Sequence, residues 1–197
     1  MKHIVNFLFE VGMLKKTPRS GYRFLGSGRE SVADHCFRTS VIGYVLSLDE
    51  EGVDPHRTVL LCLMHDLPEA RTGDLNYVNK RYVKADEDKA LKDLAVDLPF
   101  GGDIVDLVRE FNAGESLEAR LARDADQLDL ILELKEQLDL GNKYASDWLV
   151  YALKRLQSPS AREMANSILE TDSTEWWFEK RTDLWVNGLP DPHRDKE

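Results

Sequence analysis

Cysteine is scarce in this sequence of 197 residues, which contains only Cys36 and Cys62. Two cysteines do not suggest the disulfide framework of a small secreted domain, and a chain of this length can bury a core without such cross-links. Cys62 lies three residues before His65. A Cys-x-x-His metal pair is therefore an alternative to the more common role of a free cysteine, that of a small apolar core residue.

Long apolar runs are also missing. None approaches the roughly 20 residues that span a bilayer. The opening segment, residues 1–10, is interrupted by Glu10 and is too short for a secretory signal, so it is better explained as a first amphipathic helix. These absences favour a soluble, cytoplasmic protein that does not act in a membrane.

Basic charge is in deficit, since 26 Lys and Arg residues stand against 36 Asp and Glu residues and give a formal net charge of −10. Such a surface repels phosphate polymers, which disfavours DNA or RNA as an extended partner. A small anionic substrate is still compatible with this charge, because one divalent cation and one or two arginines can reverse the local field.

Strand-like alternation, internal repeats and low-complexity tracts are absent, and the 12 glycines and 7 prolines are scattered. Apolar residues instead recur at helical spacing, which predicts an all-α fold with a single domain over residues 1–188 and a polar tail at 189–197. Three helix starts carry capping residues, at Asp54-Pro55, Ser116 and Ser158-Pro159. We predict a bundle of about eight to nine helices, at roughly 2–14, 30–49, 55–69, 83–96, 101–112, 116–139, 145–157, 159–171 and 174–186.

The last predicted helix carries an aromatic cluster, formed by Trp176, Trp177, Phe178 and Trp185. Large aromatic side chains most often pack into a core. We therefore predict that this helix closes the core, with a dimer interface as the minority alternative.

The first candidate site residues are His65 and Asp66. They follow an apolar run at residues 60–64, which predicts a buried helix. Ionisable residues at the end of such a helix are costly unless they are paired or bound to a metal. Neighbouring helical residues are about 100° apart, so both can flank one ion while Glu69 lies one turn further on the same side. Imidazole and carboxylate ligands are typical of Mn, Fe, Co, Ni or Zn, whereas Mg is less expected beside histidine.

Two further ligands have less certain positions. His35 lies in the first turns of a helix that Glu30-Ser31 opens. Periodicity leaves the fourth ligand open, because Asp124 falls inside an apolar arc and Asp126 lies roughly opposite, yet a central helix packed on both sides can direct either one inward. One metal is favoured over two, since the remaining histidines lie near the chain ends or on an opposite helix face. These are His3, His56 and His193.

Four blocks of the chain resemble, in order and at fitting intervals, the HD-domain metal-dependent phosphohydrolases, and more narrowly the HD-domain 5′-deoxynucleotidases. The blocks are Pro18-Arg19-Ser20-Gly21-Tyr22, Glu30-Ser31-Val32-Ala33-Asp34-His35, His65-Asp66-x-x-Glu69-x-x-x-Gly73-Asp74 and Asp124-Ala125-Asp126-Gln127-Leu128. The likeness extends over most of the first two thirds of the chain. It implies an all-helical HD domain, usually a homodimer, whose substrates are deoxyribonucleoside 5′-monophosphates.

Carried over residue by residue, the resemblance also implies roles. It gives one divalent metal ion four protein ligands: His35, His65, Asp66 and Asp126. Glu69 and Asp74 match the acidic pair that handles the attacking water and the leaving group. Arg19 matches an arginine that binds the 5′-phosphate, and Tyr22 and Arg23 are further candidates for substrate binding.

The chain departs from the family pattern in the loop before the second block. Tyr22 stands where the family often has tryptophan. Residues 24–29 read Phe-Leu-Gly-Ser-Gly-Arg, where the family usually carries another arginine and a proline. Because this loop forms part of the sugar and base wall, the departures concern nucleotide selectivity and not the metal site. Lys80 is a lesser candidate for phosphate binding.

Two other functions are compatible with these residues. A different HD phosphohydrolase, such as a nucleotide triphosphatase, a phosphodiesterase or an alarmone hydrolase, would share the metal site. The alarmone enzymes usually show His-Asp-x-x-Glu-Asp, where this chain has Ala70, and two-metal phosphodiesterases need additional histidines. Outside enzymes, a helical module could hold a structural metal, but a closed structural site does not need spare carboxylates such as Glu69 and Asp74.

Overall fold

The structure, a computed structural model, describes residues 1–178, 186 and 188. Its elements are α1 (Lys2–Val11), η1 (Gly12–Lys15), α2 (Tyr22–Leu25), α3 (Val32–Leu48), α4 (Pro55–Met64), α5 (Glu69–Thr72), η2 (Asn79–Arg81), α6 (Glu87–Ala95), α7 (Gly101–Ala113), α8 (Leu117–Asp139), α9 (Ala145–Leu153) and α10 (Pro159–Glu170). Within this part of the chain, β-type pairing is limited to an isolated bridge between Pro18 and Ser31. The all-α prediction is therefore confirmed. None of the described helices has the length and apolar character needed to cross a bilayer.

The predicted capping residues begin their helices. Side-chain oxygens of Asp54, Ser116 and Ser158 accept hydrogen bonds from the backbone N–H groups of His56, Ala119 and Ala161. Such bonds satisfy donors that the helix itself leaves without partners. At α3, Ser31 and Asp34 form a reciprocal capping box, which fixes the start of the helix that carries His35.

Several predicted helices are shorter than expected. Residues 2–14 divide into α1 and η1, and the helix predicted at 55–69 ends at Met64, so that His65 and Asp66 lie in the turn that follows. The prediction that this helix is buried nearly all round is wrong, because Leu60 and Leu63 are about two-fifths exposed. Apolar periodicity cannot distinguish a buried face from an exposed apolar one, since both carry the same residues.

The predicted C-terminal helix is wrong over residues 174–178. Residues 174–177 form turns, and Trp176 is 86% exposed while Trp177 is half exposed. Trp185 and the polar tail at 189–197 lie outside the described residues, so the domain limit at residue 188 stays a prediction.

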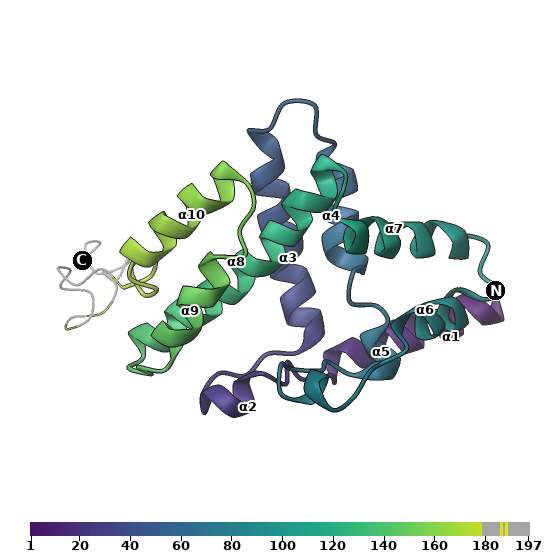
Figure 1. Cartoon of the computed structure of the whole chain (residues 1–197), viewed down its shortest axis with the longest axis horizontal. Helices are drawn as coiled ribbons and strands as arrows, with labels where there is room; N and C mark the ends of the chain where they lie inside the picture. The colour runs from purple at the N-terminus through teal and green to yellow at the C-terminus, as the bar shows by residue number, and fades with distance from the viewer. Residues whose placement is uncertain (179–185, 187, 189–197) are drawn as a thin grey trace, which may run out of the picture.

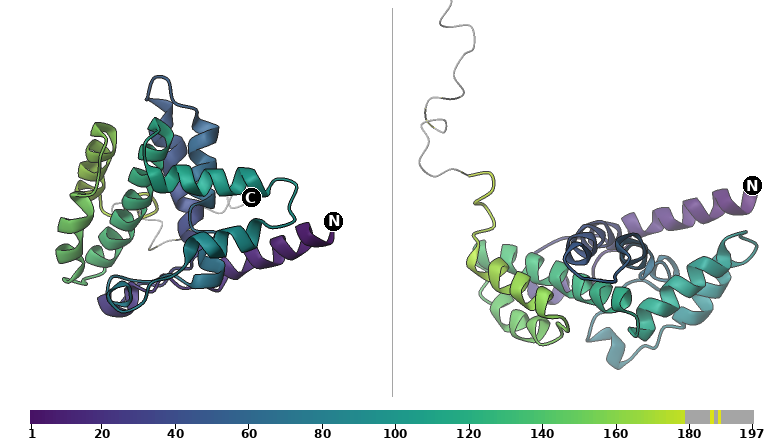
Figure 2. Two further views of the ribbon diagram at one scale, coloured as in Figure 1. Left: turned by 45° about the vertical axis from the view of Figure 1, so that its right-hand side comes forward. Right: turned by 90° about the horizontal axis from the view of Figure 1, so that it is seen from above.

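Helix α8 occupies the centre of the arrangement (Figure 1). It packs against α3 and α4 on one side and against α9 and α10 on the other. The short helix α5 packs against η1 and α6, and α6 packs against α7, in a second group. Figure 2 shows, from above, that α3 and α4 stand between the α8–α10 group and the end of the molecule that holds α6. This central position explains why α8 is buried on more than one face.

Two apolar clusters meet along α3 and at the end of α4. Ile42 and Leu46 of α3 belong to the larger cluster, around α8, α9 and α10, whereas Val32 and Cys36 belong to the smaller one, with residues from α1, α6 and α7. The chain after α4 passes between them, since Leu61 lies in the larger cluster and Leu67 in the smaller. His35, His65 and Asp66 therefore lie where the two clusters meet, on backbone that is packed on both sides.

Because α8 is buried, shortening one of its core side chains should lower the stability of the protein strongly. Leu134 is fully buried, so Leu134→Ala removes packed methyl groups and should lower the free energy of unfolding by about 2–5 kcal/mol. Leu140, at the end of the same helix, is 79% exposed, so Leu140→Ala should change it by less than about 0.5 kcal/mol. Denaturant unfolding of both variants measures the difference. Equal losses would contradict the placement of α8.

Candidate metal centre

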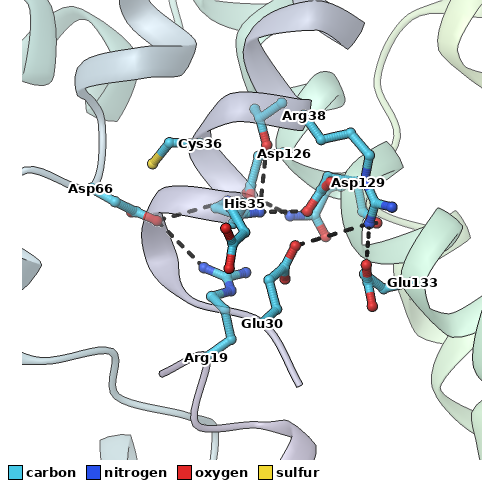
Figure 3. Close-up of polar contacts among 12 residues, drawn as sticks. Arg19, Glu30, His35, Cys36, Arg38, Asp66, Asp126, Asp129 and Glu133 are labelled. Atoms are coloured by element: carbon cyan, nitrogen blue, oxygen red, sulfur yellow. Dashed lines mark hydrogen bonds and ion pairs between the residues drawn. The ribbon is translucent and has the colours of Figure 1, made fainter. Parts of the chain in front are cut away.

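The four predicted metal ligands come together from three parts of the chain, and Figure 3 labels three of them, His35, Asp66 and Asp126. His35 Nε2 lies 3.2 Å from Asp126 Oδ1 and 3.7 Å from Asp66 Oδ2. His65 Nε2 lies 3.2 Å from Asp66 Oδ2. The nitrogen atoms of His35 and His65 and an oxygen of Asp126 all lie within 4.8 Å of one another, close enough to surround one ion.

Each histidine presents the nitrogen that a metal requires. His35 Nδ1 bonds to Asp129 Oδ2 at 2.6 Å, and His65 Nδ1 bonds to the carbonyl oxygen of Cys62 at 2.7 Å. Because each Nδ1 faces an acceptor, each Nδ1 keeps a proton, and Nε2 is the nitrogen that can present a lone pair to a cation. Both Nε2 atoms are buried and have no hydrogen-bond partner among the described residues. Two such nitrogens facing two carboxylates fit a divalent cation.

Charge pairing holds this group together when no cation is bound. Burial and Arg19 lower the pKa of His35, but the close carboxylates of Asp126 and Asp129 outweigh them and raise it to about 10. Burial would raise the pKa of Asp126, yet the close contact with His35 and its charge hold that pKa well below its usual range. The carboxylates are thus ionised, and a cation that binds here replaces a proton on His35.

Helical periodicity does not decide whether Asp124 or Asp126 lies in the ligand cluster, but their contacts in the structure differ clearly. Asp124 is fully buried, and its two oxygens accept hydrogen bonds from the backbone N–H groups of Gln157 and Ser158 at 2.7 and 2.8 Å. It joins α8 to the segment between α9 and α10. Asp126 faces His35, so Asp126 and not Asp124 lies in the cluster.

Glu69 and Asp74 lie beside this cluster with different surroundings. Glu69 begins α5, and its Oε2 atom is buried without a hydrogen-bond partner among the described residues. Burial, together with the charges of Asp66 and Asp74, raises the pKa of Glu69 to about 9. Asp74 instead accepts a 2.6 Å hydrogen bond from the backbone N–H of Ser20, which fastens the neighbouring loop.

The predicted substrate residues divide between two pockets. Arg19 Nη1 lies 3.4 Å from Asp66 Oδ2, and Arg19, Glu69, Asp74 and Lys80 line a polar pocket of about 280 Å³ over the cluster. Tyr22 and Arg23 line a neighbouring pocket of about 290 Å³, which Arg19 also borders. Tyr22 is buried there and donates a 3.2 Å hydrogen bond to Glu30 Oε2.

Cys62 packs in the larger apolar cluster, which confirms the core role that the sequence favours over a Cys-x-x-His metal pair, and its thiol does not join the grouped ligand atoms. Cys36 is the thiol near the site, since its sulfur lies within 4.8 Å of ligand atoms of His65 and Asp66. His3 and His56 are exposed. His193 lies outside the described residues.

Sequence reasoning missed several residues that complete the site. Asp129 supports His35, and the ring of Phe111 lies 4.5 Å, centre to centre, from that of His65. Asp129 could have been found, because it lies three residues after Asp126 on the same helix side. Phe111 carries no local signal, since it reaches the site from the distant helix α7. The pocket is completed by Asn112, Gln127 and Arg155.

Known proteins are similar to this chain in sequence and in fold. The HD domain family matches residues 11–168. The 5′-deoxynucleotidase HDDC2 of Bos taurus is 32% identical over 148 residues, which cover 72% of this chain and 71% of that protein. A conserved hypothetical protein from Pyrococcus furiosus is 31% identical and superimposes with a TM-score of 0.73 over 85% of this chain and 99% of its own.

A predicted metal-dependent phosphohydrolase from Magnetospirillum magnetotacticum, 24% identical, shares the fold with a TM-score of 0.69 over 86% of this chain and 90% of its own. The helical fold and the His-Asp cluster define a metal-dependent phosphohydrolase of the HD type. This chain belongs to the HD-domain family, as its sequence motifs indicate.

Proposed function

We propose that the protein hydrolyses deoxyribonucleoside 5′-monophosphates to nucleoside and phosphate. One observation carries the reaction class: two buried imidazole nitrogens without partners face two carboxylates at the base of a polar pocket that Arg19 and Glu69 line. The name of the Bos taurus relative, a 5′-deoxynucleotidase, supports the substrate. The protein's cytoplasmic location stays a prediction.

We propose one divalent ion as the cofactor, held by His35, His65, Asp66 and Asp126. Mixed nitrogen and oxygen ligands favour Co, Mn, Zn, Fe or Ni over Mg. When bound, the ion supplies Lewis-acid polarisation of the phosphate and acidifies water. Four protein ligands leave room in a six-coordinate shell for substrate and water.

The chain's own residues supply the remaining steps. Arg19, whose guanidinium already lies beside Asp66, binds two phosphate oxygens in the fork geometry that lysine cannot reproduce. Glu69 accepts the proton of the attacking water, because its buried, partnerless oxygen lies over the cluster and a bound cation brings its raised pKa down toward neutrality. Asp74 orients the nucleophile or protonates the departing 5′-oxygen, and its bond to Ser20 holds the Arg19 loop in place.

The direct test is phosphate release from a panel of deoxy and ribo nucleoside 5′-monophosphates. The protein is stripped with a chelator and refilled with Co, Mn, Zn or Mg. Release that needs metal and favours the deoxy substrates supports the proposal. Triphosphates and cyclic nucleotides are tested beside them, with products separated by chromatography, and turnover of these alone would move the substrate to another phosphoester within the same family. No release from any phosphoester by a chain that binds the ion would support the non-catalytic metal-binding alternative.

Arg19→Ala should lower kcat/KM for the preferred monophosphate by about a hundredfold, because a charge-assisted bidentate contact is lost. Arg19→Lys should recover only part of this loss, since an ammonium cannot contact two oxygens in one plane. Arg81, in the nearby η2, does not line the pocket, so Arg81→Ala is the matched control. Steady-state kinetics at saturating metal measures all three variants. An Arg19→Ala enzyme with wild-type kcat/KM would remove Arg19 from phosphate binding.

We propose that the protein forms a homodimer through the outer face of α3. Phe37, Val41, Tyr44 and Leu48 recur at helical spacing on this face, and each is 47% exposed or more. Large apolar stripes are rarely left in water by monomers. A two-fold interface would place the same stripe on both subunits and bury it.

Sedimentation velocity tests the dimer. The wild-type chain should sediment as a dimer of 22.5 kDa subunits, and Val41→Glu, which places a charge in the middle of the stripe, should sediment as a monomer. Val83→Glu, at an exposed valine outside α3, is the control and should remain dimeric. A monomeric wild-type chain would contradict the proposal.

A further inference from the structure

A second row of charged residues lies behind His35, on the side away from the pocket (Figure 3). Asp129 Oδ2 meets His35 Nδ1 at 2.6 Å. The other oxygen, Oδ1, accepts a hydrogen bond from Arg38 Nε at 2.5 Å, and Arg38 Nη2 reaches the backbone carbonyl of Asp129 at 3.3 Å. Both carboxylate oxygens of Asp129 are therefore engaged, one by the histidine and one by the arginine.

We propose that Asp129, held by Arg38, is a positioning residue that sets the affinity of the metal site through His35. The inference rests on the proposed metal site and extends it to two residues that bind neither metal nor substrate. Asp129 keeps the proton on Nδ1, so that Nε2 presents its lone pair to the ion. Its negative charge also increases the electron density of the imidazole and strengthens the bond to a cation.

The burial of Asp129 explains why Arg38 is required. Asp129 is 1% exposed, and an ionised carboxylate at such a position needs a compensating charge. Arg38 supplies this charge, because its guanidinium is always protonated and contacts both Oδ1 and the backbone carbonyl of Asp129.

Arg38 is itself held in a fixed direction. Its Nη2 donates to Glu133 at 2.6 Å and its Nη1 to Glu136 at 3.0 Å. Residues 129, 133 and 136 are spaced as neighbours along one side of α8. The guanidinium on α3 thus contacts three successive carboxylates on α8. The same contacts could serve only to fasten α3 to α8, so a test must separate metal affinity from stability.

The Asp129→Asn variant separates an effect on metal affinity from an effect on stability, because it keeps the size of the side chain and removes its charge. The asparagine amide can also donate to Nδ1, which favours the tautomer that has its proton on Nε2. We expect Co²⁺ or Mn²⁺ to bind about 10- to 100-fold more weakly to chelator-stripped Asp129→Asn than to the wild-type chain, in calorimetry without nucleotide. The downfield imidazole Nδ1 proton of His35 should be lost from the NMR spectrum. Arg38→Lys, which retains the charge but not the fork, should give an intermediate loss of affinity.

Glu136→Gln is the matched control, since Glu136 contacts Arg38 and does not reach Asp129. Its metal affinity should stay within about twofold of wild type, even if its unfolding midpoint falls as far as that of Asp129→Asn. Unchanged metal affinity in folded Asp129→Asn would overturn the inference and leave the metal site intact. A wild-type chain that binds no ion would instead overturn the metal site, and the inference with it.

Discussion

Asp66→Ala should abolish metal-dependent phosphate release, with a loss of at least about a thousandfold in kcat. Asp66 Oδ2 lies between His65, His35 and Arg19, at 3.2, 3.7 and 3.4 Å. Its removal takes one proposed ligand from the ion and leaves Arg19 without its carboxylate partner. Phosphate release at saturating metal, with metal content measured in parallel, tests this expectation.

Asp106→Ala is the control for that experiment, because Asp106 is an exposed aspartate on the neighbouring helix α7 and does not line the pocket. It should keep full activity. Asp66→Ala should still fold, since the helices around it are held by two apolar clusters that do not include Asp66. A folded Asp66→Ala protein with undiminished turnover would exclude Asp66 from the metal site.

The all-helical fold could be predicted because its signals are local. Helical spacing of apolar residues and the caps at Asp54, Ser116 and Ser158 lie within single segments, and the structure reproduces them. Helix ends were less predictable, because they depend on tertiary contacts. The helix that contains Leu60 continues only to Met64, and the exposed Trp176 shows that an aromatic cluster need not close a core.

The cluster itself could be predicted only in part. His65-Asp66 alone is a weak signal, and it gains weight because these residues follow an apolar helix and because His35, Glu69 and Asp126 can join them. The choice of Asp126 over Asp124 required either a family resemblance or coordinates, since both are carboxylates on a helix packed on several sides. Phe111 reaches the site across the fold from α7, where nothing in its own segment marks it. Arg38 lies three residues after His35 on α3, so spacing could place it near His35, but its bond to Asp129 on α8 required coordinates.

The junction between the two apolar clusters explains why the site is well positioned. His35 is fixed by a packed helix and by Asp129, whereas Asp66 lies in the short turn between α4 and α5 and Glu69 begins α5. Packing on both sides restricts the backbone of the ligands, while the pocket above them is polar and lined by charged side chains. Such a rigid base with an open polar side suits hydrolysis of a small charged ester.

Glu69→Gln should lower kcat by about 10²- to 10⁴-fold and leave metal affinity within a few-fold of wild type, because glutamine keeps the shape of the side chain but cannot accept the water's proton. The rising, low-pH part of the pH–rate profile should also flatten, since Glu69 is active as a base only when it is ionised. Steady-state kinetics over a pH series, with metal binding measured by calorimetry, tests both expectations.

Glu87→Gln is the matched control, because Glu87 lines the same pocket from the start of α6, where its side chain is exposed. Its kcat should stay close to wild type. Loss of turnover in a Glu69→Gln protein that still binds the metal would also show that the site is catalytic. It would exclude the alternative in which the metal is purely structural. If Glu69→Gln turned over at the wild-type rate, the water's proton would have to go to Asp74 instead. The raised pKa of Glu69 would then follow from its burial and from its neighbours Asp66 and Asp74 alone.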